Sequence, residues 1–141
     1  MRLATLLFLA WSLRAEFLRI QVTVHDMDCQ SCSASLESIF KRMRGVESAE
    51  VDYKAGTILI SLGPQNRISV EQIWDAVKRV GFTPAETKVQ VRVVVAAGKI
   101  EVQEANRSYA LEGHAAEGKA EIKGSMSPPS DPRTPIVLRV E

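Results

Sequence analysis

The stretch FLRIQVTVHDMDCQSC, residues 17–32, decides the fold that we predict for this chain. Its first half alternates between apolar and polar residues, which is the two-residue period of a half-buried β-strand. The side expected to face the core carries Leu18, Ile20, Val22 and Val24. A polar turn then contains Cys29 and Cys32, and an apolar pattern with helical spacing follows. The stretch therefore predicts a strand, a loop with a Cys-x-x-Cys pair and the start of a helix.

Two segments carry the single apolar stripe of an amphipathic helix. Ser69 and Gln72 have the spacing of a capping box at the start of the second one. Gly45 and Gly81 follow the two stripes, at positions where a glycine commonly ends a helix. The stripe residues are Leu36, Ile39, Phe40 and Met43 in the first helix and Val70, Ile73, Trp74 and Val77 in the second. We expect both stripes to face one core.

Three further segments have the alternation of β-strands. Residues 49–53 and 57–62 flank the short turn Lys54-Ala55-Gly56, as in a hairpin, and residues 88–95 form the last strand. The resulting order is β-α-β-β-α-β. Two helices on one side of a four-stranded antiparallel sheet form a ferredoxin-like α+β sandwich. We assign this domain to residues 17–95.

Residues 99–141 differ in composition from the preceding domain. Short alternating runs are separated by Gly, Asn, Ser and Pro, helix signals are absent, and residues 125–135 form a Pro-rich loop. Two or three strands are only marginally stable by themselves. We therefore expect a small strand-rich C-terminal appendage that packs on the first domain or extends its sheet.

The first 15 residues have the layout of a signal peptide. Arg2 lies beside the free amine, residues 3–11 are an apolar run, and Ala15 is a suitable cleavage point. The run is too short to cross a bilayer, which needs roughly 20 apolar residues. We expect cleavage after Ala15 and a periplasmic or secreted protein.

The charge balance argues against a nucleic-acid partner. The chain has 18 basic and 17 acidic residues and a net charge of +1, so it has no general attraction for polyanions. It contains no basic block and no phosphate-binding loop motif. No Ser/His/Asp arrangement and no paired-carboxylate site stands out either. We expect neither nucleic-acid binding nor an enzyme.

Cys29 and Cys32 are the residues that carry chemistry. A disulfide between them would close too small a loop to staple the chain. At the start of a helix, both the free N–H groups and the helix dipole stabilise a thiolate. Two thiolates at this spacing can bind one soft ion, namely Cu(I), Zn(II), Cd(II) or Hg(II). The same placement also suits a thiol-disulfide oxidoreductase, and that alternative stays open.

Several landmarks together resemble the heavy-metal-associated domain family. This family includes soluble copper chaperones, the periplasmic mercury scavenger and N-terminal domains of metal-transporting P-type ATPases. The resemblance covers roughly residues 17–93. Its landmarks are Met27-x-Cys29-x-x-Cys32, Gly45-Val46 and Gly81-Phe82.

The resemblance implies a role for each residue of the loop. Cys29 and Cys32 would be the metal ligands, Met27 would anchor the loop in the core, and Phe82 would shield the site. The chain would then be a metal carrier or scavenger. Its partners would be one soft metal ion and either a metal-transporting membrane protein or an acceptor metalloprotein.

Two departures from the family pattern bear on these expectations. Asp26 replaces the usual Gly before Met27, so the loop backbone is expected to differ. Asp28 replaces the Thr that is common in copper-binding members and is similar to the acidic residue of zinc- and cadmium-exporting ATPase domains. Asp28 is therefore a candidate third ligand, with a solvated loop carboxylate as the alternative. The identity of the metal stays open.

Overall fold

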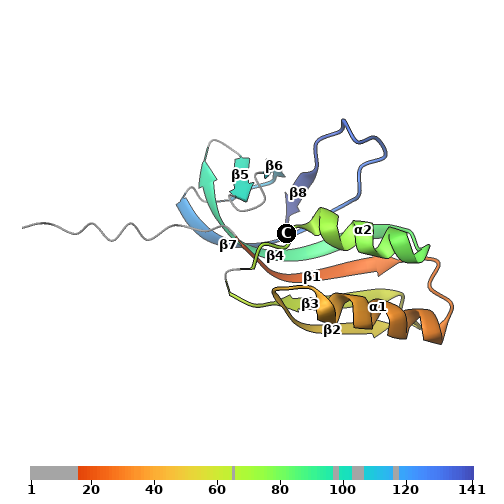
Figure 1. Cartoon of the computed structure of the whole chain (residues 1–141). Coiled ribbons are helices and arrows are strands. Elements are labelled where there is room, and N and C mark those ends of the chain that lie inside the picture. Colours follow the sequence, from red (N-terminus) through yellow and green to blue (C-terminus); the bar gives the residue numbers. More distant parts are fainter. Residues whose placement is uncertain (1–15, 65, 97–98, 103–106, 116–117) are drawn as a thin grey trace, which may run out of the picture.

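The computed structural model describes residues 16–64, 66–96, 99–102, 107–115 and 118–141. Its first part has the expected β-α-β-β-α-β order (Figure 1). The elements are β1 (Glu16–Val24), α1 (Gln30–Arg42), β2 (Val46–Asp52), β3 (Thr57–Leu62), α2 (Val70–Val80) and β4 (Pro84–Ala96). The strands pair antiparallel in the order β2-β3-β1-β4. The ferredoxin-like α+β fold is therefore confirmed, while the expected signal peptide lies outside the described residues.

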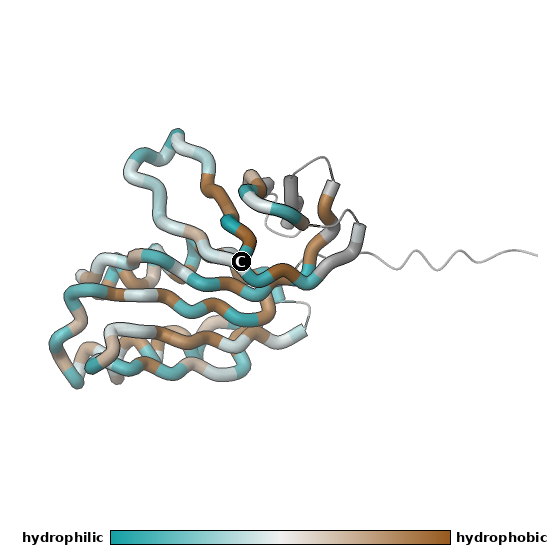
Figure 2. Tube along the Cα trace, turned by 180° about the vertical axis from the view of Figure 1, so that it is seen from behind, coloured by the Kyte–Doolittle hydropathy of each residue, from teal (hydrophilic) through white to brown (hydrophobic). Residues whose placement is uncertain are grey.

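Both helices lie on one face of this sheet and bury one core against it (Figure 1). Every residue predicted for the stripe of α2 is buried, and the capping box of Ser69 and Gln72 is present. Along the strands, hydrophobic and hydrophilic residues alternate (Figure 2), as expected for strands with one face on a core and one toward solvent. The sequence periods thus predict the order of these elements, but β2 and β4 begin three and four residues before the predicted residues 49 and 88. The first helix has its C-cap at Met43 and not at Gly45.

Two residues of the predicted core are placed differently. Ile39 is 37% exposed, because Ser33, Leu36 and Phe40 define the buried arc of α1 and Ile39 lies at its margin. In β1, the pairing register shifts between Phe17 and Arg19. This irregularity turns Phe17 into the core and leaves Leu18 only half-buried. The predictions for Ile39 and Leu18 are therefore wrong.

The C-terminal part adds strands to the same sheet, as expected. These strands are β5 (Lys99–Val102), β6 (Arg107–Glu112), β7 (Gly118–Met126) and β8 (Val137–Val140). β7 pairs with β4 from Thr87↔Met126 to Val95↔Gly118, on the edge of β4 that does not pair with β1. The pairings run from β4 to β5, β6, β8, β7 and back to β4, so they close into a ring. β7 continues to Met126, which places the start of the Pro-rich loop two residues later than predicted.

The appendage and the first domain share one hydrophobic core. The rings of Phe17 and Tyr109 meet edge to face with their centroids 6.2 Å apart. The Tyr109 hydroxyl also donates a hydrogen bond of 2.7 Å to a carboxylate oxygen of Glu71 in α2. Because β4 belongs to both parts as well, we treat them as a single packed unit.

None of the helices in the described ranges combines the length and the apolar character that crossing a bilayer would require.

Candidate metal centre

Cys29 is the N-cap residue of α1. Its backbone is extended (φ −125°, ψ 121°), and its Sγ accepts the backbone N–H of Cys32 at 3.3 Å. The first turn of a helix has N–H groups without intrahelical partners, and the helix dipole favours negative charge there. The fold therefore places a sulfur where a side-chain oxygen usually caps a helix.

Ser31 lies beside the cysteine pair, although the Cys-x-x-Cys motif alone does not indicate a role for it. Its Oγ lies 2.9 Å from the Sγ of Cys29. A hydroxyl two residues after a cysteine that caps a helix is close enough to donate to that sulfur. This spacing is the signal in the sequence that could have identified Ser31.

The two thiols have different pKa values because they share one hydrogen-bond network. A hydrogen bond from the Cys32 thiol, followed by those from Ser31 and the Cys32 backbone, lowers the pKa of Cys29 to about 7. The pKa of Cys32 is raised, first by its hydrogen bond to Cys29, then by burial and by the charges of Cys29 and Asp28. Near neutral pH, Cys29 is therefore the first to become a thiolate, and the Cys32 thiol donates to it.

We expect this difference to appear in the pH dependence of alkylation. Because the thiolate is the reacting species, the initial rate at Cys29 should rise with a midpoint near pH 7, whereas Cys32 should react only at higher pH. Peptide mapping by mass spectrometry after brief treatment with iodoacetamide measures both rates. Ser31→Ala removes a donor to the thiolate and should move the Cys29 midpoint to higher pH. Equal profiles for the two cysteines would contradict the assignment.

The other predicted residues surround the cysteine pair in different ways. Met27 is buried at 6% exposure, as expected for an anchor of the loop, and Phe82 is half-buried against the core. Asp28 is exposed, and its charge acts on Cys32. Among the described residues, no three His, Cys, Asp or Glu side chains gather as a metal site would require. The structure therefore brings together Cys29 and Cys32, and ligation by Asp28 stays a prediction.

A glycine in the neighbouring hairpin supports one side of the loop. The N–H of Val24 at the end of β1 donates to the carbonyl oxygen of Gly56 at 2.7 Å. Gly56 has φ +68°, and a Cβ there would lie 2.5 Å from the carbonyl oxygen of Val24. Only glycine fits here without displacing β1. The loop that follows β1, residues 25–29, is called the metal loop below.

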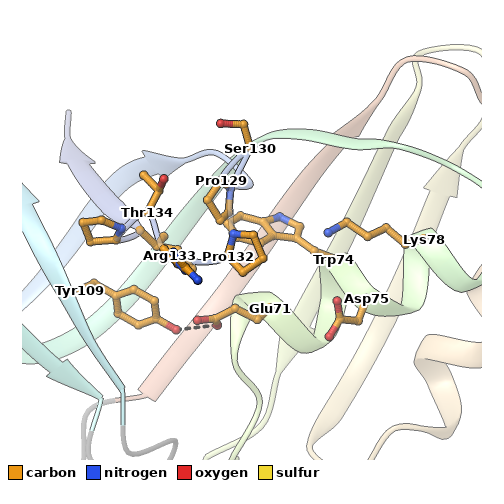
Figure 3. A pocket seen from close by; sticks show the side chains of 12 residues that line it. Glu71, Trp74, Asp75, Lys78, Tyr109, Pro129, Ser130, Pro132, Arg133 and Thr134 are labelled. Atoms are coloured by element: carbon orange, nitrogen blue, oxygen red, sulfur yellow. Dashed lines mark hydrogen bonds between the residues drawn. The ribbon is translucent and has the colours of Figure 1, made fainter.

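A cavity of about 640 Å³ lies elsewhere, between α2 and the Pro-rich loop (Figure 3). Tyr109 and Glu71 line it and are joined by their hydrogen bond. Asp75, Lys78 and Arg133 add charges of both signs. The cavity contains neither cysteine, so it is separate from the candidate metal centre.

Taken together, the fold and the cysteine pair define a small α+β domain with a thiol site at the start of its first helix. Residues 21–83 match the heavy-metal-associated domain family. The copper chaperone CopZ of Staphylococcus haemolyticus is 34% identical over 61 residues, which are 43% of this chain and 88% of that protein. The chain therefore belongs to the heavy-metal-associated domain family.

Two further matches cover very different shares of the matched proteins. The zinc-transporting ATPase of Synechocystis sp. is 32% identical over 71 residues, which are 50% of this chain and 10% of that protein. A solved CopZ metallochaperone is 26% identical, with a TM-score of 0.44, and the match covers 47% of this chain and 97% of that one. The family match ends at residue 83, so the appendage of residues 99–141 lies outside it.

Proposed function

We propose that this chain binds one soft metal ion between the thiolates of Cys29 and Cys32 and passes it to an acceptor by ligand exchange. The observation that carries the proposal is the capping geometry, in which both cysteines share one network at the start of α1. Both side chains are half-exposed, so an ion can enter and leave. The appendage pairs with β4 from Thr87 to Val95, on the edge of β4 that does not pair with β1.

Proton release accompanies binding in this mechanism. Near pH 7, Cys29 is the thiolate that binds the ion first. The Cys32 thiol loses its proton when its sulfur coordinates the same ion. An acceptor with its own thiolates can then replace these sulfurs one at a time. No covalent bond of a substrate has to break, so the function needs neither a general base nor an oxyanion hole.

The names of the relatives indicate two candidate metals for the site, copper and zinc. One relative is a copper chaperone and another is a zinc-transporting ATPase. Two sulfurs suffice for two-coordinate Cu(I) or Hg(II), whereas Zn(II) and Cd(II) need further donors. We infer that the acceptor is a metal-transporting membrane protein or a metalloprotein, and that nucleic acid is not a partner.

Anaerobic titration of the reduced protein tests the proposal. Cu(I), Zn(II) and Hg(II) are added separately in the presence of competing chelators. We expect one ion per chain for at least one of these metals, with the absorption of thiolate-to-metal charge transfer for Cu(I) or Hg(II). A protein that holds none of the three ions stoichiometrically would refute the proposed function.

The oxidoreductase alternative is favoured by one specific observation, the lowered pKa of Cys29 at a helix start. It requires the pair to cycle between dithiol and disulfide while a substrate disulfide is reduced. An insulin-reduction assay with dithiothreitol separates the two functions. We expect no rate above that of dithiothreitol by itself, and a clear acceleration would favour the alternative.

Asp28 should distinguish between metals if it is a ligand. A carboxylate is a hard donor that helps Zn(II) and contributes little to Cu(I). We expect Asp28→Ala to weaken Zn(II) binding about tenfold, or ~1.4 kcal/mol, and to change Cu(I) affinity much less. Competition with a chromophoric chelator measures both affinities, and Asp28→Asn controls for the lost charge. If both variants bind Zn(II) as the wild type does, Asp28 is a solvated loop residue.

We also propose that the protein acts outside the cytoplasm. The support is the sequence of residues 1–15, in which Arg2 precedes an apolar run that ends near Ala15. The mass of the protein recovered from the periplasm or medium of an expressing bacterium tests this. Recovery of the uncut chain from the cytoplasm would contradict it.

A further inference from the structure

Asp26 connects the metal loop to a segment far away in the sequence. Its Oδ1 accepts the backbone N–H of Thr83 at 3.1 Å, and its Oδ2 accepts the Thr83 hydroxyl at 3.3 Å. Both carboxylate oxygens are therefore used by one residue of the loop between α2 and β4. Asp26 directly precedes the buried Met27.

The topology explains why these two loops meet. β1 and β4 are antiparallel neighbours, and Val24 at the end of β1 pairs with Pro84 at the start of β4. The loop that leaves β1 and the loop that enters β4 thus lie side by side. Gly56 already holds the other side of the same strand end through its bond with Val24. The metal loop is therefore fixed to a neighbour on each side.

The segment that Asp26 holds is anchored at its other end as well. Gly81 ends α2 with φ +99°, and the N–H of Phe82 donates to the carbonyl oxygen of Val77 at 3.2 Å. The half-buried ring of Phe82 packs against the core between these two anchors. If the Asp26 contact is lost, the loop that carries Phe82 loses the two side-chain hydrogen bonds that join it to the metal loop.

Given the proposed metal-binding function, we propose that Asp26 is a positioning residue that sets how readily the bound metal is released. In this role it acts through its two hydrogen bonds with Thr83 and not as a ligand. Instead it keeps the Phe82 loop against the metal loop. Holding the two loops together restricts the motion that the thiolates need to exchange one partner for another.

The test compares Asp26→Ala with Asp26→Asn. Asparagine can keep both contacts, since its oxygen can accept the Thr83 N–H and its amide can donate to the Thr83 hydroxyl. Both variants remove the same negative charge from the neighbourhood of the thiolates. A difference between them therefore reports the hydrogen bonds and not the charge. Thr83→Val, which keeps the backbone donor and loses the hydroxyl, should give an intermediate effect.

Two measurements are made on each variant of the full chain. In the metal-free protein, hydrogen exchange at the Thr83 amide should become about three- to tenfold faster in Asp26→Ala, the range expected for losing one such hydrogen bond. In the loaded protein, transfer of Cu(I) to a strong chelator, followed by stopped flow, should accelerate by a similar factor. Asp26→Asn should restore values near those of the wild type in both.

The outcomes separate this proposal from the proposed function. A wild type that holds no metal would refute both. If the wild type binds Cu(I) and Asp26→Ala transfers it at the same rate, only the role of Asp26 is refuted. Equal acceleration in Asp26→Ala and Asp26→Asn would also refute it, because the effect would then come from the charge.

Discussion

The double substitution of Cys29→Ser and Cys32→Ser is expected to abolish stoichiometric binding of Cu(I) and Hg(II) while the protein stays folded. A serine hydroxyl is a hard donor that stays protonated near neutral pH, so it cannot replace a thiolate for a soft ion. We expect the affinity to fall by more than about a thousandfold, or ~4 kcal/mol. Anaerobic titration against a chelator of known affinity measures the loss.

The fold should survive this substitution for a structural reason. Cys29 is the N-cap of α1, and serine is among the preferred residues at that position. Neither cysteine is buried in the core. The far-ultraviolet circular dichroism spectrum and the thermal midpoint should therefore stay close to those of the wild type.

Two controls separate the thiolates from other donors. Single Cys→Ser variants keep one sulfur and should bind the same ions weakly. Wild type that has been oxidised to the Cys29–Cys32 disulfide should fail to bind, because a disulfide has no thiolate, and reduction should restore binding. One-to-one binding of Cu(I) by the double variant would show that the ion sits elsewhere.

The local parts of this molecule could be predicted because short sequence periods determine them. The capping box at Ser69 and the stripe around Trp74 depend on residues within a few positions of one another, and both are present. The position of Cys29 and Cys32 at the start of a helix is equally local. The prediction for Ile39 is wrong because it also rests on local spacing, and an apolar stripe does not show which of its margins faces solvent.

The non-local parts could not be predicted. Alternation predicts that a strand exists but does not identify its partner, so it does not predict the ring from β4 through β5, β6, β8 and β7. The parallel pairing of β6 with β8 and the long pairing of β4 with β7 join segments without any signal in common. The contact of Asp26 with Thr83 likewise spans 57 positions along the chain. A departure from a family pattern indicated Asp26, but only the fold identifies its partner.

The closed ring of strands has a consequence for stability. Leu138 in β8 is fully buried in the core that the appendage shares with the first domain. A Cβ at Gly124 of β7 would lie 2.9 Å from Cδ1 of Leu138, so the two strands pack closely at this point. Tyr109 contacts both Phe17 of β1 and Glu71 of α2. Truncation of Leu138 should therefore destabilise the first domain as well as the appendage.

We expect Leu138→Ala to lower the free energy of unfolding of the whole chain by about 2–5 kcal/mol, the usual cost of deleting a buried leucine side chain. Trp74 in α2 reports on the first domain, and its fluorescence during urea unfolding measures the effect there, in a Trp11→Phe background because the chain has a second tryptophan at position 11. Because β4 and the core are shared, the Trp74 midpoint should move together with the midpoint from circular dichroism. The same truncation at half-buried Leu111 should cost less, which controls for the loss of a leucine as such. An unchanged Trp74 midpoint in Leu138→Ala would show that residues 99–141 unfold separately from the metal-binding domain.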